Sequence, residues 1–173
     1  SPIVGFIVGF LFQKISVFLT RGQTPGVNVF FKKSQLVSSV ALSLSHGTND
    51  AQKSMGIITM TLVAYYKINP DVISNYPFLM SLETATEFKV PFWTIFFCAL
   101  AMGLGTAFGG WKIIKTVGSG IFKLRPIHGF SAQTAASTVI LSASHFGFPV
   151  STTHVVSSGI MGVGGAERIK AVK

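Results

Sequence analysis

Charged residues are scarce in this sequence, and acidic ones are the scarcest. Only 11% of the 173 residues are charged, five of them acidic, whereas 49% are hydrophobic. Soluble domains carry about 25% charged residues, so the composition argues against a disordered chain and a coiled coil. The net charge of +9 would indicate nucleic acid if the basic residues shared one solvated face. They lie in several short, separated segments instead, which predicts a membrane-embedded protein without a nucleic-acid partner.

Cysteine is almost absent. Cys98 is the single cysteine, which excludes an intrachain disulfide and any metal site built from several cysteines. It lies in an apolar run, where a small buried side chain is expected. The sequence therefore predicts neither a disulfide framework nor a metal centre.

Four regions have few or no charges. A charge at the bilayer centre costs about 3 kcal/mol, and roughly 20 apolar residues suffice to cross, so these regions are candidate membrane segments. The first begins abruptly and lacks the basic start and cleavage site of a signal peptide, so we expect a piece of a longer chain. The four regions are 1–20, 34–66, 90–111 and 126–166.

The charges between these regions predict the topology. Segments 21–33, 112–125 and the tail 167–173 are basic, whereas 67–89 is acidic overall. Basic loops stay on the cytoplasmic side of a membrane. If the first three regions each cross once, 21–33 and 112–125 are cytoplasmic segments and 67–89 is an external loop. The expected fold is an all-α polytopic membrane protein of the plasma membrane.

The fourth region has basic segments on both sides, so it must leave and re-enter the cytoplasmic face. Gly147 and Pro149 interrupt it and should break a continuous helix. Two arms follow, 127–145 and 151–165, and the second is short for a crossing. A re-entrant helical hairpin explains this pattern, because a break at that depth is tolerated where it lines a watery cavity. Two ordinary spans joined by an external turn are the alternative.

An ionisable residue interrupts the second region. Asp50 lies among uncharged residues, near the polar side chains His46, Thr48, Asn49, Gln52 and Ser54. Ionisable residues inside a membrane mark functional sites by default. Gly47 could break the helix here, as in transporters, and Asp50 could then bind a cation or a proton. A structural pair of Asp50 with Lys53 on one helix face is the alternative.

Ser151-Thr152-Thr153-His154 directly follows Pro149. Helix N-termini present unpaired N–H donors and a positive dipole end, and nearby hydroxyls add further donors, so this run suits a small oxyanion. Simple N-capping by one hydroxyl is the alternative. Three hydroxyls and a histidine are more than a cap needs.

Two motifs together resemble a known family. HGTNDAQKSMG at 46–56 and GFPVSTTHVVSSGIMG at 147–162, separated by FSAQTAAS at 130–137, are similar to the second half of inorganic phosphate transporters of the PiT family. The resemblance covers nearly the whole chain. It implies one of two inverted repeats, each with a broken helix and a hairpin, and symport of orthophosphate with a cation. It further implies a homodimer, and a first repeat that this chain does not contain.

The resemblance also implies roles for individual residues. Asn49 would contact phosphate together with the run Ser151, Thr152 and Thr153, while Gln52 and Lys53 follow in the same motif and are further candidates for phosphate binding. Asp50 would serve the coupling cation. Gln133 stands where many sodium-dependent members carry glutamate, and would belong to the same cation site. Together with Gln52 and Lys53 after the Asn-Asp pair, Gln133 resembles the bacterial branch. This implies coupling to a proton rather than to sodium, with free phosphate or a metal–phosphate complex as the cargo.

Two other classes of protein remain open. A membrane serine hydrolase could combine Ser151 with His154 or His46 and Asp50, but no Gly-x-Ser-x-Gly element surrounds a candidate serine. A noncatalytic membrane scaffold would show apolar packing motifs without polar residues at helix breaks. The sequence therefore predicts no enzyme and no bound cofactor.

Overall fold

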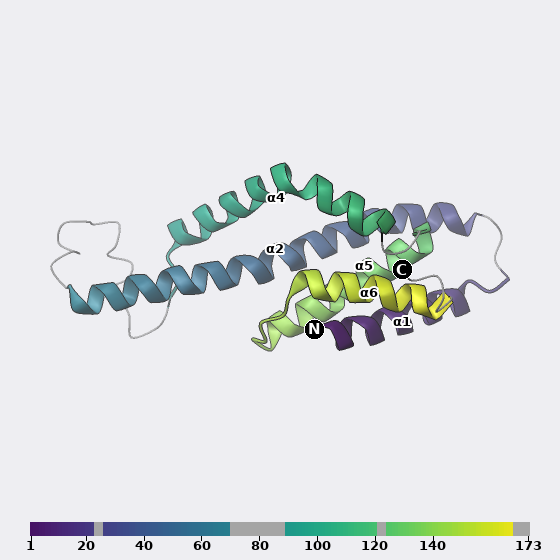
Figure 1. Ribbon diagram of the computed structural model, residues 1–173, viewed down its shortest axis with the longest axis horizontal. Helices are drawn as coiled ribbons and strands as arrows, with labels where there is room; N and C mark the ends of the chain where they lie inside the picture. Colours follow the sequence, from purple (N-terminus) through teal and green to yellow (C-terminus); the bar gives the residue numbers. More distant parts are fainter. Residues whose placement is uncertain (23–25, 70–88, 121–123, 168–173) are drawn as a thin grey trace. The chain divides into compact units, whose positions relative to one another are not determined.

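The protein consists of α-helices joined by short turns, without a strand, in the part of the chain that the structure describes. This part of the computed structural model comprises residues 1–22, 26–69, 89–120 and 124–167. Most of the predicted external loop (70–88), residues 121–123 and tail residues 168–173 lie outside it. The helices are α1 (Pro2–Leu19), α2 (Val27–Ile68), α4 (Phe92–Gly120), α5 (Pro126–His145) and α6 (Thr152–Glu167) (Figure 1). The predicted all-α class is confirmed.

The chain divides into two compact units. The first contains Ser1–Asn49 and Phe108–Lys173, and the second contains Asp50–Ala107. In the first unit, α1, α5 and α6 pack against one another, and α2 adds side chains to α5. The second unit is formed by the later part of α2 and the earlier part of α4, with Thr59 and Thr94 buried in it.

Glycines allow α1 and α6 to approach closely. A Cβ atom on Gly5 would collide with the Ser158 hydroxyl, and one on Gly9 would lie 2.9 Å from the Cα atom of Gly159. Glycines four residues apart are a common means of bringing membrane helices into backbone contact. The α1–α6 interface is therefore stabilised by close packing of backbones rather than by large side chains.

Small aliphatic residues fill the space between α5 and α6. Ala132, Ile160 and Val163 form one buried cluster, and Ala136, Val139, Ile140 and Val155 form a second. Outside these clusters, large apolar side chains point away from the protein: Phe18 is 68% exposed and Phe108 is 88% exposed. A water-soluble chain would bury such side chains, so lipid is the expected surrounding.

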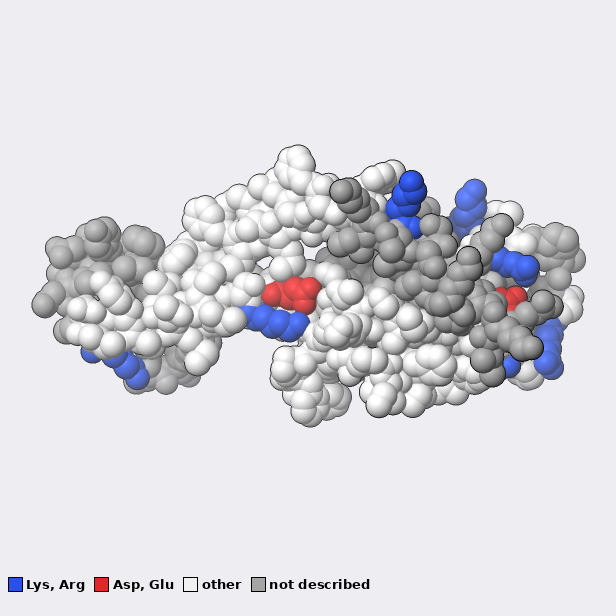
Figure 2. Space-filling view, in the orientation of Figure 1, with Lys and Arg blue, Asp and Glu red and all other residues white. Residues whose placement is uncertain are grey.

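Two of the described helices are long and apolar enough to cross a bilayer, namely Pro2–Leu19 and Phe92–Trp111. The basic side chains gather at one end of the first unit. There, where α1 ends and α2 begins, Figure 2 shows a group of Lys and Arg side chains. In the sequence, the exposed Arg21 follows α1 and the exposed Lys32 and Lys33 lie near the start of α2, as expected for an end that faces one membrane surface.

The predicted break in the second region is wrong. α2 runs without interruption from Val27 to Ile68, through Gly47. A single glycine inside a helix costs only about 1 kcal/mol relative to alanine, which a long helix easily tolerates. The hydroxyls of Ser45 and Thr48 donate to the carbonyls of Ala41 (2.6 Å) and Leu44 (2.8 Å), within the same helix.

Two helices extend beyond the membrane spans predicted for them, although the apolar stretch Phe92–Trp111 agrees with the predicted span 90–111. Residues 27–33 of the predicted loop 21–33 already belong to α2. α4 begins at Phe92, next to Pro91, but continues beyond the Gly109-Gly110 end predicted for span 90–111 and takes in most of segment 112–125. Lysines are good helix formers when exposed, so a charge can end a membrane crossing without ending a helix.

The fourth region contains the two arms in the predicted places. α5 ends at His145 and α6 begins at Thr152. Gly147 adopts a left-handed conformation (φ 72°), and the N–H of Phe148 donates to the carbonyl of Ala143 at 2.8 Å. This is how a glycine commonly ends a helix. Whether the hairpin re-enters the membrane stays a prediction.

Candidate functional site

The turn between α5 and α6, residues 146–151, is held by a residue of α2. Asn49 is 3% exposed, and its Nδ2 donates to the carbonyl of Val150 at 3.2 Å. Its Oδ1 accepts a hydrogen bond from the Ser144 hydroxyl at 3.3 Å. One amide therefore joins the last turn of α5 to the residue before the Ser-Thr-Thr run, and fixes the turn on α2.

The predicted oxyanion residues occupy the start of α6. Ser151 is exposed, and its hydroxyl accepts the backbone N–H of His154 at 3.5 Å, which is a weak N-cap. Its own N–H donates to the hydroxyl of Ser1 at 3.3 Å. Thr152 is 3% exposed, whereas Thr153 is exposed. The three neighbouring hydroxyls thus differ in accessibility, and the capping alternative is supported for Ser151.

Gln133 lies away from this turn. Its Oε1 accepts the hydroxyl of Ser38 at 2.6 Å, in the first unit. Ser38 and Asn49 are both on α2, and at 1.5 Å per residue they lie about 16 Å apart along the helix axis. The structure therefore does not bring Gln133 together with Asn49, although the sequence predicts both for the same transport site.

Asp50, Gln52 and Lys53 belong to the second unit. Lys53 Nζ lies 3.1 Å from Asp50 Oδ1, with side chains 39% and 28% exposed. Gln52 is exposed. The predicted pairing at i, i+3 is present, and such a half-exposed pair contributes at most about 1 kcal/mol. The ion pair does not exclude a functional role for Asp50. Because the pair is weak, Asp50 could leave Lys53 and bind a cation or a proton instead.

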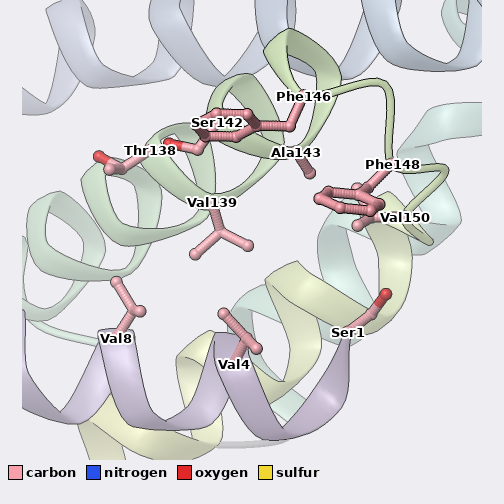
Figure 3. Close-up of a pocket in the computed structure, with 10 residues that line it drawn as sticks. All are labelled: Ser1, Val4, Val8, Thr138, Val139, Ser142, Ala143, Phe146, Phe148 and Val150. Atoms are coloured by element: carbon pink, nitrogen blue, oxygen red, sulfur yellow. The ribbon is translucent and has the colours of Figure 1, made fainter.

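An apolar pocket lies beside the turn, in the first unit. It has a volume of about 450 Å³. Figure 3 shows Val4 and Val8 of α1 and Val139 of α5 pointing into it, with Phe148 beside the turn. Its lining residues are apolar apart from Ser1, Thr138 and Ser142, and none of them has a charged or amide side chain. A phosphate dianion would lose its hydration there without gaining a charged or amide side chain as partner, so this pocket is a poor match for the predicted phosphate site.

Sequence reasoning missed the partners of Asn49. Ser144 belongs to a group of hydroxyls in α5 that are more common as packing residues than as ligands, and a carbonyl such as that of Val150 leaves no trace in a sequence. The parallel pairing of α2 with α5 was missed too. Ser38–Gln133 and Asn49–Ser144 both join residues 95 apart, a register that no single motif reveals.

Comparison with known proteins identifies the family of the chain. The phosphate transporter family matches residues 1–173. The chain is 43% identical, over 99% of its length, to a "Probable low-affinity inorganic phosphate transporter" of Bacillus subtilis, of which it covers 47%. A protein of the same name from Rhizobium meliloti is 41% identical over 100% of the chain and 47% of that protein.

A "Putative phosphate permease" of Thermococcus kodakarensis is 31% identical over 99% of the chain and 39% of its own length. No solved structure matches. The chain thus spans about half the length of the first two of these relatives and less of the third, and the three are named as transporters or permeases. With the family match extending from its first residue to its last, the chain belongs to the phosphate transporter family.

Proposed function

We propose that this chain is part of a multi-pass plasma-membrane transporter that moves inorganic phosphate by symport with a cation, a proton in preference to sodium. The observation that carries the proposal is the attachment of Asn49 to both sides of the hairpin turn. It fixes the start of α6, where the Ser-Thr-Thr run lies. The start of a helix presents backbone N–H donors, and the hydroxyls of this run add further donors. In a member of the phosphate transporter family, such a group of donors suits the phosphate oxyanion.

Phosphate would be held by the first turn of α6. The hydroxyl of Thr152, buried in the hairpin, and the exposed hydroxyls of Ser151 and Thr153 are candidate donors. Asn49 donates to the carbonyl of Val150, the residue directly before this run, and is a further candidate for contact with phosphate. Charge-assisted hydrogen bonds to phosphate are about twice as strong as neutral ones, so a few such donors give useful affinity without preventing release.

The coupling cation would be served by Asp50. Lys53 is already within 3.1 Å of its carboxylate, so a proton or cation on Asp50 would weaken this pair and leave Lys53 able to attract phosphate. Gln52 follows in the same motif and is a further candidate ligand for phosphate. Gln133 would belong to the cation pathway at a separate position, since Ser38 holds it.

The remaining partners follow from the family. Relatives are about twice as long as this chain, so we propose that a first repeat completes the transport pathway and that the whole protein forms a homodimer in the bilayer. The transported species would be free phosphate or a metal–phosphate complex.

Uptake of radiolabelled phosphate by the full-length protein in sealed vesicles tests the proposal. A proton gradient and a sodium gradient are imposed separately, each with and without Mg²⁺ or a chelator. We expect accumulation with the proton gradient alone. Accumulation only with sodium would contradict the proton assignment, and no uptake under any gradient, from protein that is shown to be inserted and folded, would favour the scaffold alternative.

A further inference from the structure

Gln13 of α1 is a buried amide whose two polar atoms are unpaired. The residue is 1% exposed, and among the residues that the structure describes neither its Oε1 nor its Nε2 has a hydrogen-bond partner. A carboxamide that is removed from water normally has both its donor and its acceptor paired, because leaving them unpaired is costly in an apolar surrounding. Gln13 therefore needs a partner that can both donate and accept.

Thr134 of α5 carries another unpaired group. Its Oγ1 is buried and has no hydrogen-bond partner in the described part of the chain. The next two hydroxyl residues of this helix differ from it: Ser137 and Thr138 donate to carbonyls four residues earlier, at 2.7 Å and 2.8 Å. A hydroxyl in a helix often bonds to such a carbonyl. The hydroxyl of Thr134 does not, and is available to another partner.

The helices α1 and α5 pack against each other in opposite directions. The hydroxyl of Ser131 donates to Oγ of Ser16 at 3.0 Å. Eight residues earlier on α1, Val8 packs against the buried cluster that contains Val139, which lies eight residues later on α5. Both valines also line the apolar pocket (Figure 3). The register between the two helices is therefore the same at both points.

In this register Gln13 and Thr134 lie at the same level of the interface. Gln13 precedes Ser16 by three residues and Thr134 follows Ser131 by three, so each is about one turn from the serine contact. Neither side chain bonds to the other. Unpaired polar groups that lie at one level of a buried interface are commonly joined by a bound small molecule.

The unpaired atoms select the kind of molecule. Oε1 of Gln13 accepts, Nε2 donates, and the hydroxyl of Thr134 does either. A cation would pair with the two oxygens but would face the amide donor. An anion would pair with the donors and leave Oε1 unpaired. Water donates and accepts, and a buried water makes about three hydrogen bonds, as many as there are unpaired atoms on these two side chains.

The charges near this level also favour a neutral molecule. The helices α1, α5 and α6 contain one carboxylate, that of Glu167 at the end of α6, and it lies 2.8 Å from Nε2 of His128. Lys14, next to Gln13, is exposed, and its Nζ lies 5.5 Å from the centroid of the Phe10 ring. An ion in this interface would thus lack a countercharge, which is costly inside a membrane.

We propose that Gln13 and Thr134 bind a water molecule that bridges α1 and α5. Hydrogen bonds through water are nearly as favourable in enthalpy as direct ones, so the bridge stabilises the packing of α1 on α5. Thr134 and Ser144 are ten residues apart on α5, about 15 Å at 1.5 Å per residue. The water site is therefore separate from the turn, and it depends neither on phosphate binding nor on the proposed coupling role of Asp50.

A structure of the full-length protein, at a resolution that shows ordered water, tests the site directly. We expect a water peak about 2.7–3.2 Å from polar atoms of both Gln13 and Thr134. In Gln13→Leu, which keeps the approximate size of the side chain and removes both amide atoms, the peak should be lost. A direct hydrogen bond between the two side chains of the parent, or no peak between them, would refute the bridge.

Thermal unfolding of the full-length protein in detergent tests whether the two residues share one partner. Gln13→Leu and Thr134→Val should each lower the midpoint by a few degrees, and the double variant should lower it no further than the larger single effect. Thr138→Val removes a hydroxyl that bonds within its own helix and should change the midpoint little. Additive effects would overturn the shared water. A higher midpoint in Gln13→Leu would show that the amide has no partner, with the same consequence.

Sodium separates water from a bound cation. The midpoints of the parent, Gln13→Leu and Thr138→Val are compared in sodium chloride and in choline chloride at the same ionic strength. A water site predicts that the difference between the parent and Gln13→Leu is the same in both salts. A stabilisation by sodium that the parent and Thr138→Val share and Gln13→Leu lacks would refute water in favour of a cation. None of these measurements uses phosphate, so failure here would leave the proposed transport function standing.

Discussion

Asn49 of α2 donates its amide N–H to the carbonyl of Val150 at 3.2 Å, across 101 residues of sequence. The carbonyl of Val150 lies just before α6 in a half-buried residue, and the loss of a hydrogen-bond partner from a desolvated carbonyl costs about 1–3 kcal/mol. Asn49 supplies that partner and also accepts the Ser144 hydroxyl. An asparagine in the middle of a long, uninterrupted helix thereby stabilises a break in another part of the chain.

Replacing Asn49 by aspartate tests this relationship. The carboxylate keeps an acceptor for Ser144 but removes the donor to Val150, so two oxygens face each other. We expect a loss of about 1–3 kcal/mol in stability, seen as a lower midpoint of thermal unfolding in detergent, and faster proteolysis within 146–151. The control Asn69→Asp changes an amide that donates to Tyr65, four residues earlier in the chain, and an equal effect there would contradict the role of Asn49.

The hydroxyl of Thr152 is the second target. Thr152→Val keeps the shape of a buried side chain and removes the hydroxyl, so a bound phosphate loses one donor. We expect apparent phosphate affinity to fall roughly 5- to 150-fold, equivalent to about 1–3 kcal/mol, measured by uptake at varied phosphate concentration. Thr138→Val is the matched control, because that hydroxyl bonds to its own helix carbonyl. Unchanged affinity in Thr152→Val would favour the capping interpretation.

Because glycines let α1 and α6 pack closely, the effect of a glycine-to-alanine change on stability should depend strongly on its position. Gly9→Ala places a Cβ against the backbone of Gly159, 2.9 Å from its Cα, and neither helix can yield without separating from the other. We expect a lower unfolding midpoint and reduced yield in membranes. Gly103→Ala, at a position with open space around it, should instead leave stability unchanged or raise it slightly. Equal effects at both positions would argue against close α1–α6 packing.

The predicted orientation is checked by labelling with an impermeant thiol reagent in intact cells, with Cys98→Ala as background. Arg21→Cys lies in the predicted cytoplasmic segment and should be protected. Ile68→Cys, 77% exposed at the end of α2, lies where the external loop is predicted and should react. Reaction of Arg21→Cys from outside would refute the topology.

Some of the fold could be predicted from the sequence because its signals are local. Gly147 and Pro149 located the break between α5 and α6, since their backbone restrictions act at the residue itself. Gly47 gave the same signal but no break, because the intrinsic cost of one glycine is small beside the helix around it. Charges proved to be poor markers of helix ends, as Lys32 and Lys33 show, because they limit burial in lipid rather than helix formation.

The candidate site was less predictable because its contacts are distant in the chain. The motif around Asn49 indicated an important residue, but not that Val150 and Ser144 would be its partners. Gln133 was expected near the same site, and the register between α2 and α5 places it beside Ser38 instead. His128 carried no sequence signal at all, since its meaning comes from Glu167, 39 positions away at the other end of the hairpin.

Coupling is tested at Asp50. Asp50→Asn preserves size and fixes the charge at zero, so a cation or proton can no longer be bound and released there. Because coupling between two ligands is reciprocal, we expect loss of gradient-driven phosphate accumulation and a flat pH dependence of phosphate binding, in protein that still inserts and folds. Accumulation is measured in vesicles, and binding by calorimetry across a pH series.

A structural role for the pair with Lys53 predicts a different pattern. If Asp50 serves only as the partner of Lys53, Asp50→Asn should lower expression or thermal stability because the lysine loses its carboxylate. The double variant Asp50→Asn with Lys53→Gln removes both charges and should then restore stability and accumulation together. If Asp50 has a coupling role, the double variant can regain stability but not accumulation, because neither position 50 nor position 53 then carries a titratable group. Restored accumulation in the double variant would therefore refute coupling through Asp50.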